Sequence, residues 1–208
     1  MPKKSIINRK LTGKTPKKII DVAIDLFSRK GFKGTSIRDI AAEVGMTTSN
    51  IYHYFGTKSG VLEAIERQTL EPIMREFRRI AAIDMPPLER LSLLIRSHLT
   101  YMDSHRKESK IFTLREENFP KGNKNLNKRF QTEALFIYRT EIDRLLTSMG
   151  REENCTIAAF NTLGVIIWFL RWYNPEGRCT LDEVIDSIIK FVLHGIIGNP
   201  HAGQQAFR

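Results

Sequence analysis

Apolar residues recur every three to four positions along most of this 208-residue chain, and that spacing is typical of amphipathic α-helices. No stretch shows the alternation of apolar and polar residues that a half-buried strand requires. The pattern therefore predicts an all-α fold of about nine helices. The expected helices span residues 16–30, 37–44, 48–55, 58–82, 87–104, 106–118, 124–149, 153–172 and 180–198.

Two short helices around a tight turn are predicted within Thr35–Lys58. Ser36 is a good N-cap, and Asp39 three positions later can return a hydrogen bond to the backbone. Gly45 ends the first helix where a residue with positive φ is needed. Thr47 can then cap the second helix, so the stretch has the local signals of a helix-turn-helix.

The second of these helices has one apolar face and one polar face. Ile51 and Phe55 lie four residues apart on the side that faces the core. The opposite face carries Thr48, Ser49, Tyr52 and His53. A face of short polar side chains suits a helix that lies in the major groove of DNA.

The domain organisation follows from these helices and one break in the pattern. The first three helices can share the core of a compact head at residues 1–56, which begins with a basic arm. A larger helical domain is expected at 57–198, and residues 199–208 are expected to form a flexible tail. Met85-Pro86-Pro87, inside the larger domain, is the clearest linker in the chain. The candidate core of the head consists of Ile20, Ile24, Phe27, Ile40, Ala41, Val44, Ile51 and Phe55.

The last two helices have the pattern of a dimerisation surface. Thr180 and Glu183 form a capping box for the final helix. The helix at 153–172 is apolar nearly all round, so it must be covered on more than one side. Gly164 and Gly195 permit close approach of another helix. Pairing with a second copy would cover these helices and give the twofold symmetry of a palindromic DNA site.

Composition and charge narrow the function. The formal net charge is +10, and residues 1–58 hold twelve Lys and Arg against four acids, which leaves only +2 for the rest of the chain. The positive charge thus lies with the helix-turn-helix candidate, as phosphate binding requires.

Several other functions are disfavoured. Cys155 and Cys179 are too few for a disulfide framework, and no apolar segment follows the basic N-terminus, so a cytoplasmic protein is expected. The uncharged run 154–170 is slightly short for a bilayer span, and burial in an interface is favoured over a membrane. His98 and His105 have no third ligand nearby. No metal, cofactor or enzymatic activity is predicted.

The order and spacing of these features resemble the TetR family of bacterial one-component transcriptional regulators. The resemblance rests on the helical run at 19–31, Gly34-Thr35-Ser36-Ile37-Arg38-Asp39-Ile40-Ala41, Gly45-Met46-Thr47 and Ile51-Tyr52-His53-Tyr54-Phe55 with Lys58. It implies an N-terminal DNA-binding domain and a C-terminal domain that binds a small-molecule inducer. It also implies a homodimer, joined through the last two helices, on a palindromic operator.

The resemblance also implies roles for individual residues in the head. By analogy, Tyr52 and Lys58 would hold phosphates of the DNA backbone. The other residues expected on or near the DNA are Thr35, Ser36, Arg38, Thr47, Thr48, Ser49 and His53.

A second similarity concerns the ligand. The junction Trp172-Tyr173-Asn174-Pro175-Glu176-Gly177 resembles that of the branch that answers to acyl-CoA thioesters in lipid catabolism. Segment 106–129 carries a local charge of +5 with interleaved aromatic residues, which suits an anionic ligand with an apolar tail. An exposed helix face and loop is nevertheless the favoured interpretation of these charges. The candidate ligand residues are Phe112, Arg115, Phe119, Phe130, Trp168, Arg171 and Trp172.

The sequence thus predicts a ligand-responsive transcriptional repressor that is released from its operator by a small molecule. Two alternatives remain at this stage. One is an architectural or protein-partnered DNA-binding regulator without a small-molecule switch. The other is an enzyme that happens to be basic, which would require catalytic geometry around His98, His105 or His194. For Trp168, Arg171 and Trp172, the dimer core or plain structural packing is at least as good an interpretation as a ligand pocket.

Overall fold

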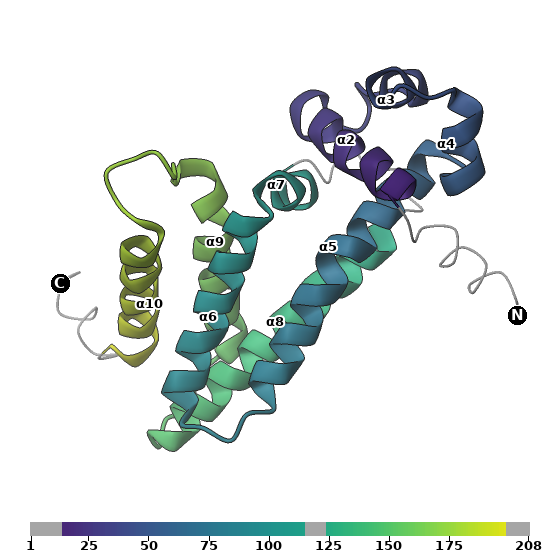
Figure 1. Cartoon of the computed structure of the whole chain (residues 1–208). Helices are drawn as coiled ribbons and strands as arrows, with labels where there is room; N and C mark the ends of the chain where they lie inside the picture. Colours follow the sequence, from purple (N-terminus) through teal and green to yellow (C-terminus); the bar gives the residue numbers. More distant parts are fainter. Residues whose placement is uncertain (1–13, 115–123, 199–208) are drawn as a thin grey trace, which may run out of the picture. The chain divides into compact units, whose positions relative to one another are not determined.

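The computed structural model describes residues 14–114 and 124–198. These residues form helices and turns and contain no strand, so the all-α prediction is confirmed (Figure 1). The basic arm, Arg115, Phe119 and the expected tail lie outside the described residues. The helices are α2 (Lys14–Lys30), α3 (Ile37–Val44), α4 (Thr48–Phe55), α5 (Lys58–Ala81), α6 (Pro87–Ser104), α7 (Arg106–Leu114), α8 (Lys124–Ser148), α9 (Cys155–Trp172) and α10 (Leu181–Ile197).

Contacts within the chain define two compact units. The first contains the described residues up to Pro72 together with those of 105–130, and the second contains 73–104 together with 131–198. The helices α5 and α8 each contribute to both units. The first unit therefore includes α7, which the sequence pattern placed in the C-terminal domain.

The core of the first unit is built as the helical spacing predicts. Seven of the eight predicted core residues are buried, and Phe55 packs against them partly exposed. Ile111 and Phe112 of α7 add to the same cluster. Burial of each such side chain contributes roughly 1.5–3 kcal/mol, so α7 is an integral part of the unit.

The predicted helix ends of the helix-turn-helix are confirmed. Asp39 N–H donates to Ser36 Oγ at 3.1 Å, and Ser36 N–H donates to the Asp39 carboxylate at 2.7 Å. The Ser36 hydroxyl also donates to this carboxylate at 2.7 Å, and this bond, together with the one from the Ser36 backbone, holds the pKa of Asp39 below its usual value. Gly45 has φ 76°, and Thr47 accepts from the backbone N–H of Asn50 at 3.3 Å.

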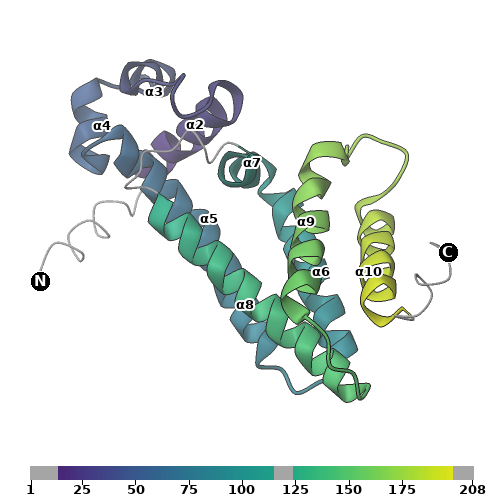
Figure 2. The ribbon, with the colours of Figure 1, turned by 180° about the vertical axis from the view of Figure 1, so that it is seen from behind.

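In the second unit, α6, α9 and α10 pack against one another (Figures 1 and 2). Phe77 of α5, His98 of α6 and Tyr138 of α8 form an aromatic cluster in its core, with ring centroids 4.9–6.1 Å apart. The Tyr138 hydroxyl lies 3.2 Å from His98 Nδ1. Burial lowers the pKa of His98 to about 3, so this imidazole is a neutral core group.

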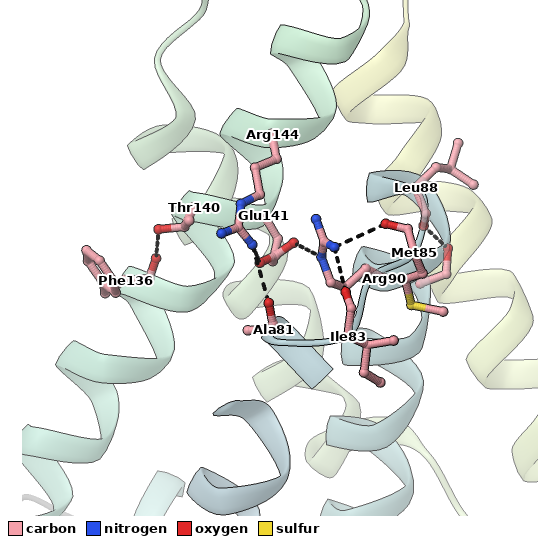
Figure 3. A network of polar contacts seen from close by, with 10 residues as sticks. Ala81, Ile83, Met85, Leu88, Arg90, Phe136, Thr140, Glu141 and Arg144 are labelled. Atoms are coloured by element: carbon pink, nitrogen blue, oxygen red, sulfur yellow. Dashed lines mark hydrogen bonds and ion pairs between the residues drawn. The ribbon is translucent and has the colours of Figure 1, made fainter. Parts of the chain in front are cut away.

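A buried ion pair fastens the turn between α5 and α6 to α8 (Figure 3). The Glu141 carboxylate is 1% exposed and accepts from Arg90 Nε at 2.5 Å and from Arg144 at 2.6 Å. Arg90 also donates to the carbonyls of Ile83 and Met85, at 2.9 and 3.1 Å. The two guanidinium groups satisfy the carboxylate, which the cost of burying a charge requires.

Arginine side chains hold α10 near both of its ends. Arg96 of α6 pairs with Asp182, at 3.2 Å, and with Asp186 in the first part of α10. Arg151, in the turn before α9, donates to the carbonyl of Ile197 at 2.8 Å. The position of α10 in this unit thus depends on polar contacts as well as on its buried apolar face.

Candidate DNA-binding and dimerisation surfaces

The recognition-helix candidate α4 packs against the core with one face and exposes polar side chains on the other. Ile51 is fully buried against the core of the first unit, whereas Ser49 and His53 are exposed and Tyr52 is 52% exposed. Thr48 is half-buried at the first position of the helix. The predicted division into a buried and an exposed face is therefore present, and contact of the exposed face with DNA stays a prediction.

Lys58 lies at the first position of α5, and its ammonium group is hydrogen-bonded to backbone carbonyls of the same chain. Its Nζ donates to the carbonyls of Phe32 and Thr35, both at 2.8 Å, and lies 4.3 Å from the centre of the Phe32 ring. Burial lowers the pKa of Lys58. Two of the three ammonium protons thus serve the turn between α2 and α3. The family resemblance implied a phosphate contact for this lysine, and the sequence did not indicate the contacts with these carbonyls.

The other residues of the predicted DNA-binding set have different environments. The Thr35 side chain is 1% exposed and donates to the Gly31 carbonyl at 2.9 Å, so its hydroxyl stabilises the turn. Ser36 and Thr47 are exposed N-caps of α3 and α4. Arg38 is exposed on the first turn of α3. Of these four, Arg38 has the side chain that is most available to a phosphate or a base.

The helix α7 is joined to α2 by charge as well as by apolar packing. Lys107 Nζ donates to Asp25 Oδ1 at 2.8 Å, and Arg29 pairs with the other oxygen of Asp25 at 2.5 Å. The hydrogen bond from Lys107 is the main reason why the pKa of Asp25 is lowered. The α7–α2 contact was not predicted, because residues 82 positions apart give no signal in a single sequence.

The candidate ligand residues are distributed over both units. Phe112 is 3% exposed in the core of the first unit, where its carbonyl accepts from the amide of Asn127 at 3.1 Å. Phe130 packs against the same core. Trp168, Arg171 and Trp172 belong to the second unit, and all three are exposed on α9. Phe112 thus packs in the core, and both its role in ligand binding and a pocket that unites the set stay predictions.

A large apolar surface lies over α9 and α10. One side of α9 presents a line of exposed residues at helical spacing, here termed the α9 stripe. Beside it, Phe191 of α10 is 67% exposed. The two helices line an open groove of about 850 Å³. The α9 stripe consists of Ile157, Phe160, Asn161, Gly164, Trp168 and Trp172.

The chemistry of this surface differs from that of a membrane span. The helix α9 is long and apolar enough to cross a bilayer by length and composition, and 33% of it is buried. Asn161 and Gly164 interrupt its exposed side, and the groove continues onto α10. An exposed apolar surface of this extent, rimmed by polar residues, is typical of a protein interface.

The helix-turn-helix head and the helical second unit define a DNA-binding transcriptional regulator. Family models agree with this class: "Bacterial regulatory proteins, tetR family" matches residues 19–65, and "Tetracyclin repressor-like, C-terminal domain" matches residues 84–196. The chain belongs to the TetR family, as its motifs predicted.

Similar proteins cover nearly the whole chain. The transcriptional repressor KstR2 of Rhodococcus jostii strain RHA1 is 24% identical over 189 residues, which are 88% of this chain and 91% of KstR2. A TetR/AcrR regulator from Thermobifida fusca is 30% identical with a TM-score of 0.67, over 90% of this chain and 98% of that one. AibR, solved with isovaleryl coenzyme A and operator DNA, is 23% identical with a TM-score of 0.75, over 84% of this chain and 96% of AibR.

Proposed function

We propose that this protein is a transcriptional repressor that binds a palindromic operator as a homodimer and is released from it by a small molecule. The observation that carries the proposal is the arrangement of α4, with Ile51 buried beneath it and the polar side chains of Ser49, Tyr52 and His53 exposed. A short helix held in this way by a helical core is suited to the major groove. Membership of the TetR family supports the same function.

The α7–α2 contact supports a route for the ligand signal. Ile111 and Phe112 pack into the core that positions the helix-turn-helix, and Lys107 binds Asp25 of α2. A ligand that prefers one position of α7 therefore also selects one position of α2. Its effect on DNA affinity equals the difference in its binding to the two states, typically about 1–3 kcal/mol in such systems.

The surface on α9 and α10 supports the homodimer. A second copy would cover the large apolar side chains of the α9 stripe and Phe191, which are exposed in the single chain. A twofold axis between two copies would present two heads to half-sites about one or two helical turns apart on DNA. The operator is therefore expected to be palindromic.

An acyl-CoA thioester is the ligand class that we propose. AibR, which shares the fold, has been solved with isovaleryl coenzyme A. The positive charge of segment 106–129 suits the phosphates of coenzyme A, and the half-buried Arg106 and Lys110 of α7 lie in its described part. An anionic head with an apolar tail matches a basic surface next to an apolar core.

The experiment is selection of the operator from random duplex DNA with the purified protein, followed by gel-shift titration with and without a panel of acyl-CoA thioesters. The expected result is a palindromic consensus and a loss of affinity of about 5- to 150-fold with one class of thioester. Free coenzyme A and the corresponding free acids are the controls. Failure to enrich any sequence would refute the repressor. An operator that no thioester releases would refute the ligand class and favour a regulator without a small-molecule switch.

A further inference from the structure

The α9 stripe has a self-complementary order of residues. Large apolar side chains lie on both sides of a small and polar middle, which is formed by Asn161 and Gly164. Glu153 is exposed at the amino end of the stripe, where one of its carboxylate oxygens pairs with Arg151 of the same chain, and Arg171 is exposed at the carboxyl end, over the ring of Trp168. If the stripe is turned end for end and laid on itself, acid meets base, and apolar residues meet apolar residues.

No contact within the single chain accounts for a glycine at position 164. Glycine in the interior of a helix weakens the helix relative to alanine, so its presence requires a compensating contact. A Cβ at Gly164 would meet no atom within 4 Å, and the same holds for Gly195 on the opposite side of the groove. The compensating contact is therefore expected from another chain, whose backbone approaches closely at this point.

Asn161 also indicates a contact with another chain at this part of the α9 stripe. Its side-chain amide makes no hydrogen bond among the described residues, although Phe160 and Trp168 on the same stripe are 58% and 59% exposed. A partner that covers these apolar neighbours also removes water from the amide, which is unfavourable unless the amide gains a partner. An amide carries both donors and acceptors, so two copies of Asn161 can satisfy each other.

We propose that α9 of a second copy crosses this α9 in antiparallel orientation, with Asn161 and Gly164 at the crossing point. The two Asn161 amides hydrogen-bond to each other beside the twofold axis, and Arg171 of each copy faces Glu153 of the other. The inference rests on the proposed homodimer and adds its register. Asn161 is then the residue that makes this chain select another copy of itself, as a single buried asparagine does in helical coiled coils.

Cysteine cross-linking tests the register directly. In a Cys179→Ser background, Asn161→Cys is expected to give a covalent dimer on mild oxidation, because a disulfide requires Cα atoms within about 7 Å. Ile157→Cys is one helical turn away, about 6 Å along each helix, so an antiparallel crossing at Asn161 leaves its two copies apart. Thr147→Cys, exposed on α8, is the surface control. Equal cross-linking of Asn161→Cys and Ile157→Cys would contradict the antiparallel register.

A second variant tests the close approach. Gly164→Leu is expected to keep the helix content of the wild type, since the single chain has room for the side chain, and to weaken dimerisation at least 100-fold in sedimentation experiments. A wild-type protein that is monomeric at micromolar concentration would overturn the proposed homodimer and this inference together. A dimeric wild type whose Gly164→Leu variant dimerises equally well would overturn only the crossing point.

Discussion

Lys58 is the residue for which the sequence motif and the structure suggest different roles. The motif places it at a DNA phosphate, whereas the structure shows its ammonium bound to the carbonyls of Phe32 and Thr35. We predict that Lys58→Met, which keeps the apolar stem and removes the charge, acts mainly by loosening the turn that leads into α3. The variant is expected to lose stability, and to lose DNA affinity without a change in its salt dependence.

The magnitude follows from the two lost hydrogen bonds. Hydrogen bonds from a charged donor contribute about 1.5–3 kcal/mol each when they are well shielded from water. Lys58 is only partly buried and water can replace it at the two carbonyls, so we expect a total loss of about 1–3 kcal/mol. A lysine that neutralises a phosphate behaves differently. Its removal lowers the slope of log affinity against log salt by about 0.9 for each contact, or about 1.8 in a dimer.

The assay combines urea unfolding with DNA titrations at several salt concentrations. Lys33→Met is the matched control, because Lys33 lies exposed in the same turn and the substitution removes the same charge. A slope that falls by about 1.8 in Lys58→Met, together with unchanged unfolding, would refute the structural role and establish the phosphate contact. A lowered unfolding free energy with an unchanged slope would establish the anchoring role.

Three further predictions concern other parts of the molecule. Tyr52→Phe should leave the unfolding free energy within about 0.5 kcal/mol of wild type and weaken operator binding several-fold, as measured by gel shift, because it removes one exposed hydroxyl. Glu141→Ala should cost about 3–5 kcal/mol in urea unfolding because it strands Arg90, whereas Arg144→Ala, which removes the half-exposed partner, should cost about 1 kcal/mol or less. Because the pKa of His98 is about 3 in the folded state, the unfolded chain takes up a proton on this imidazole first as the pH falls. The free energy of unfolding should therefore decrease as the pH drops below about 6.5. In a His98→Asn variant, this decrease should be smaller by up to about 1.4 kcal/mol per pH unit.

The helix-turn-helix shows how much local sequence can determine. The cap pair Ser36 and Asp39, the positive φ at Gly45 and the cap at Thr47 were predicted from residue type and spacing, and all are present. Each depends on atoms only three or four residues apart. The same holds for the capping box of Thr180 and Glu183 at the start of α10. Such features survive in any fold that keeps the helix, and a single sequence is therefore enough to find them.

The candidate ligand site shows where this reasoning stops. Phe112 was assigned to a pocket because aromatic and basic residues alternate around it, yet it is buried in the core of the first unit. Composition records that an aromatic residue is present and does not record which helix packs over it. The buried pair of Arg90 and Glu141 joins positions 51 residues apart, and a charged residue at a helical core position is the only signal of it in the sequence.

The sequence by itself determined the helices, their caps, the polar face of α4 and the apolar excess of α9, because these depend on periodicity and on neighbours within one turn. Only the tertiary structure decided that α7 packs with the DNA-binding head, that Lys58 binds carbonyls 23 and 26 residues before it, and that the glycines of α9 and α10 line one open groove. These contacts join residues far apart along the chain. Many pairings of amphipathic helices satisfy the same local pattern, and the choice among them is made by how their side chains pack.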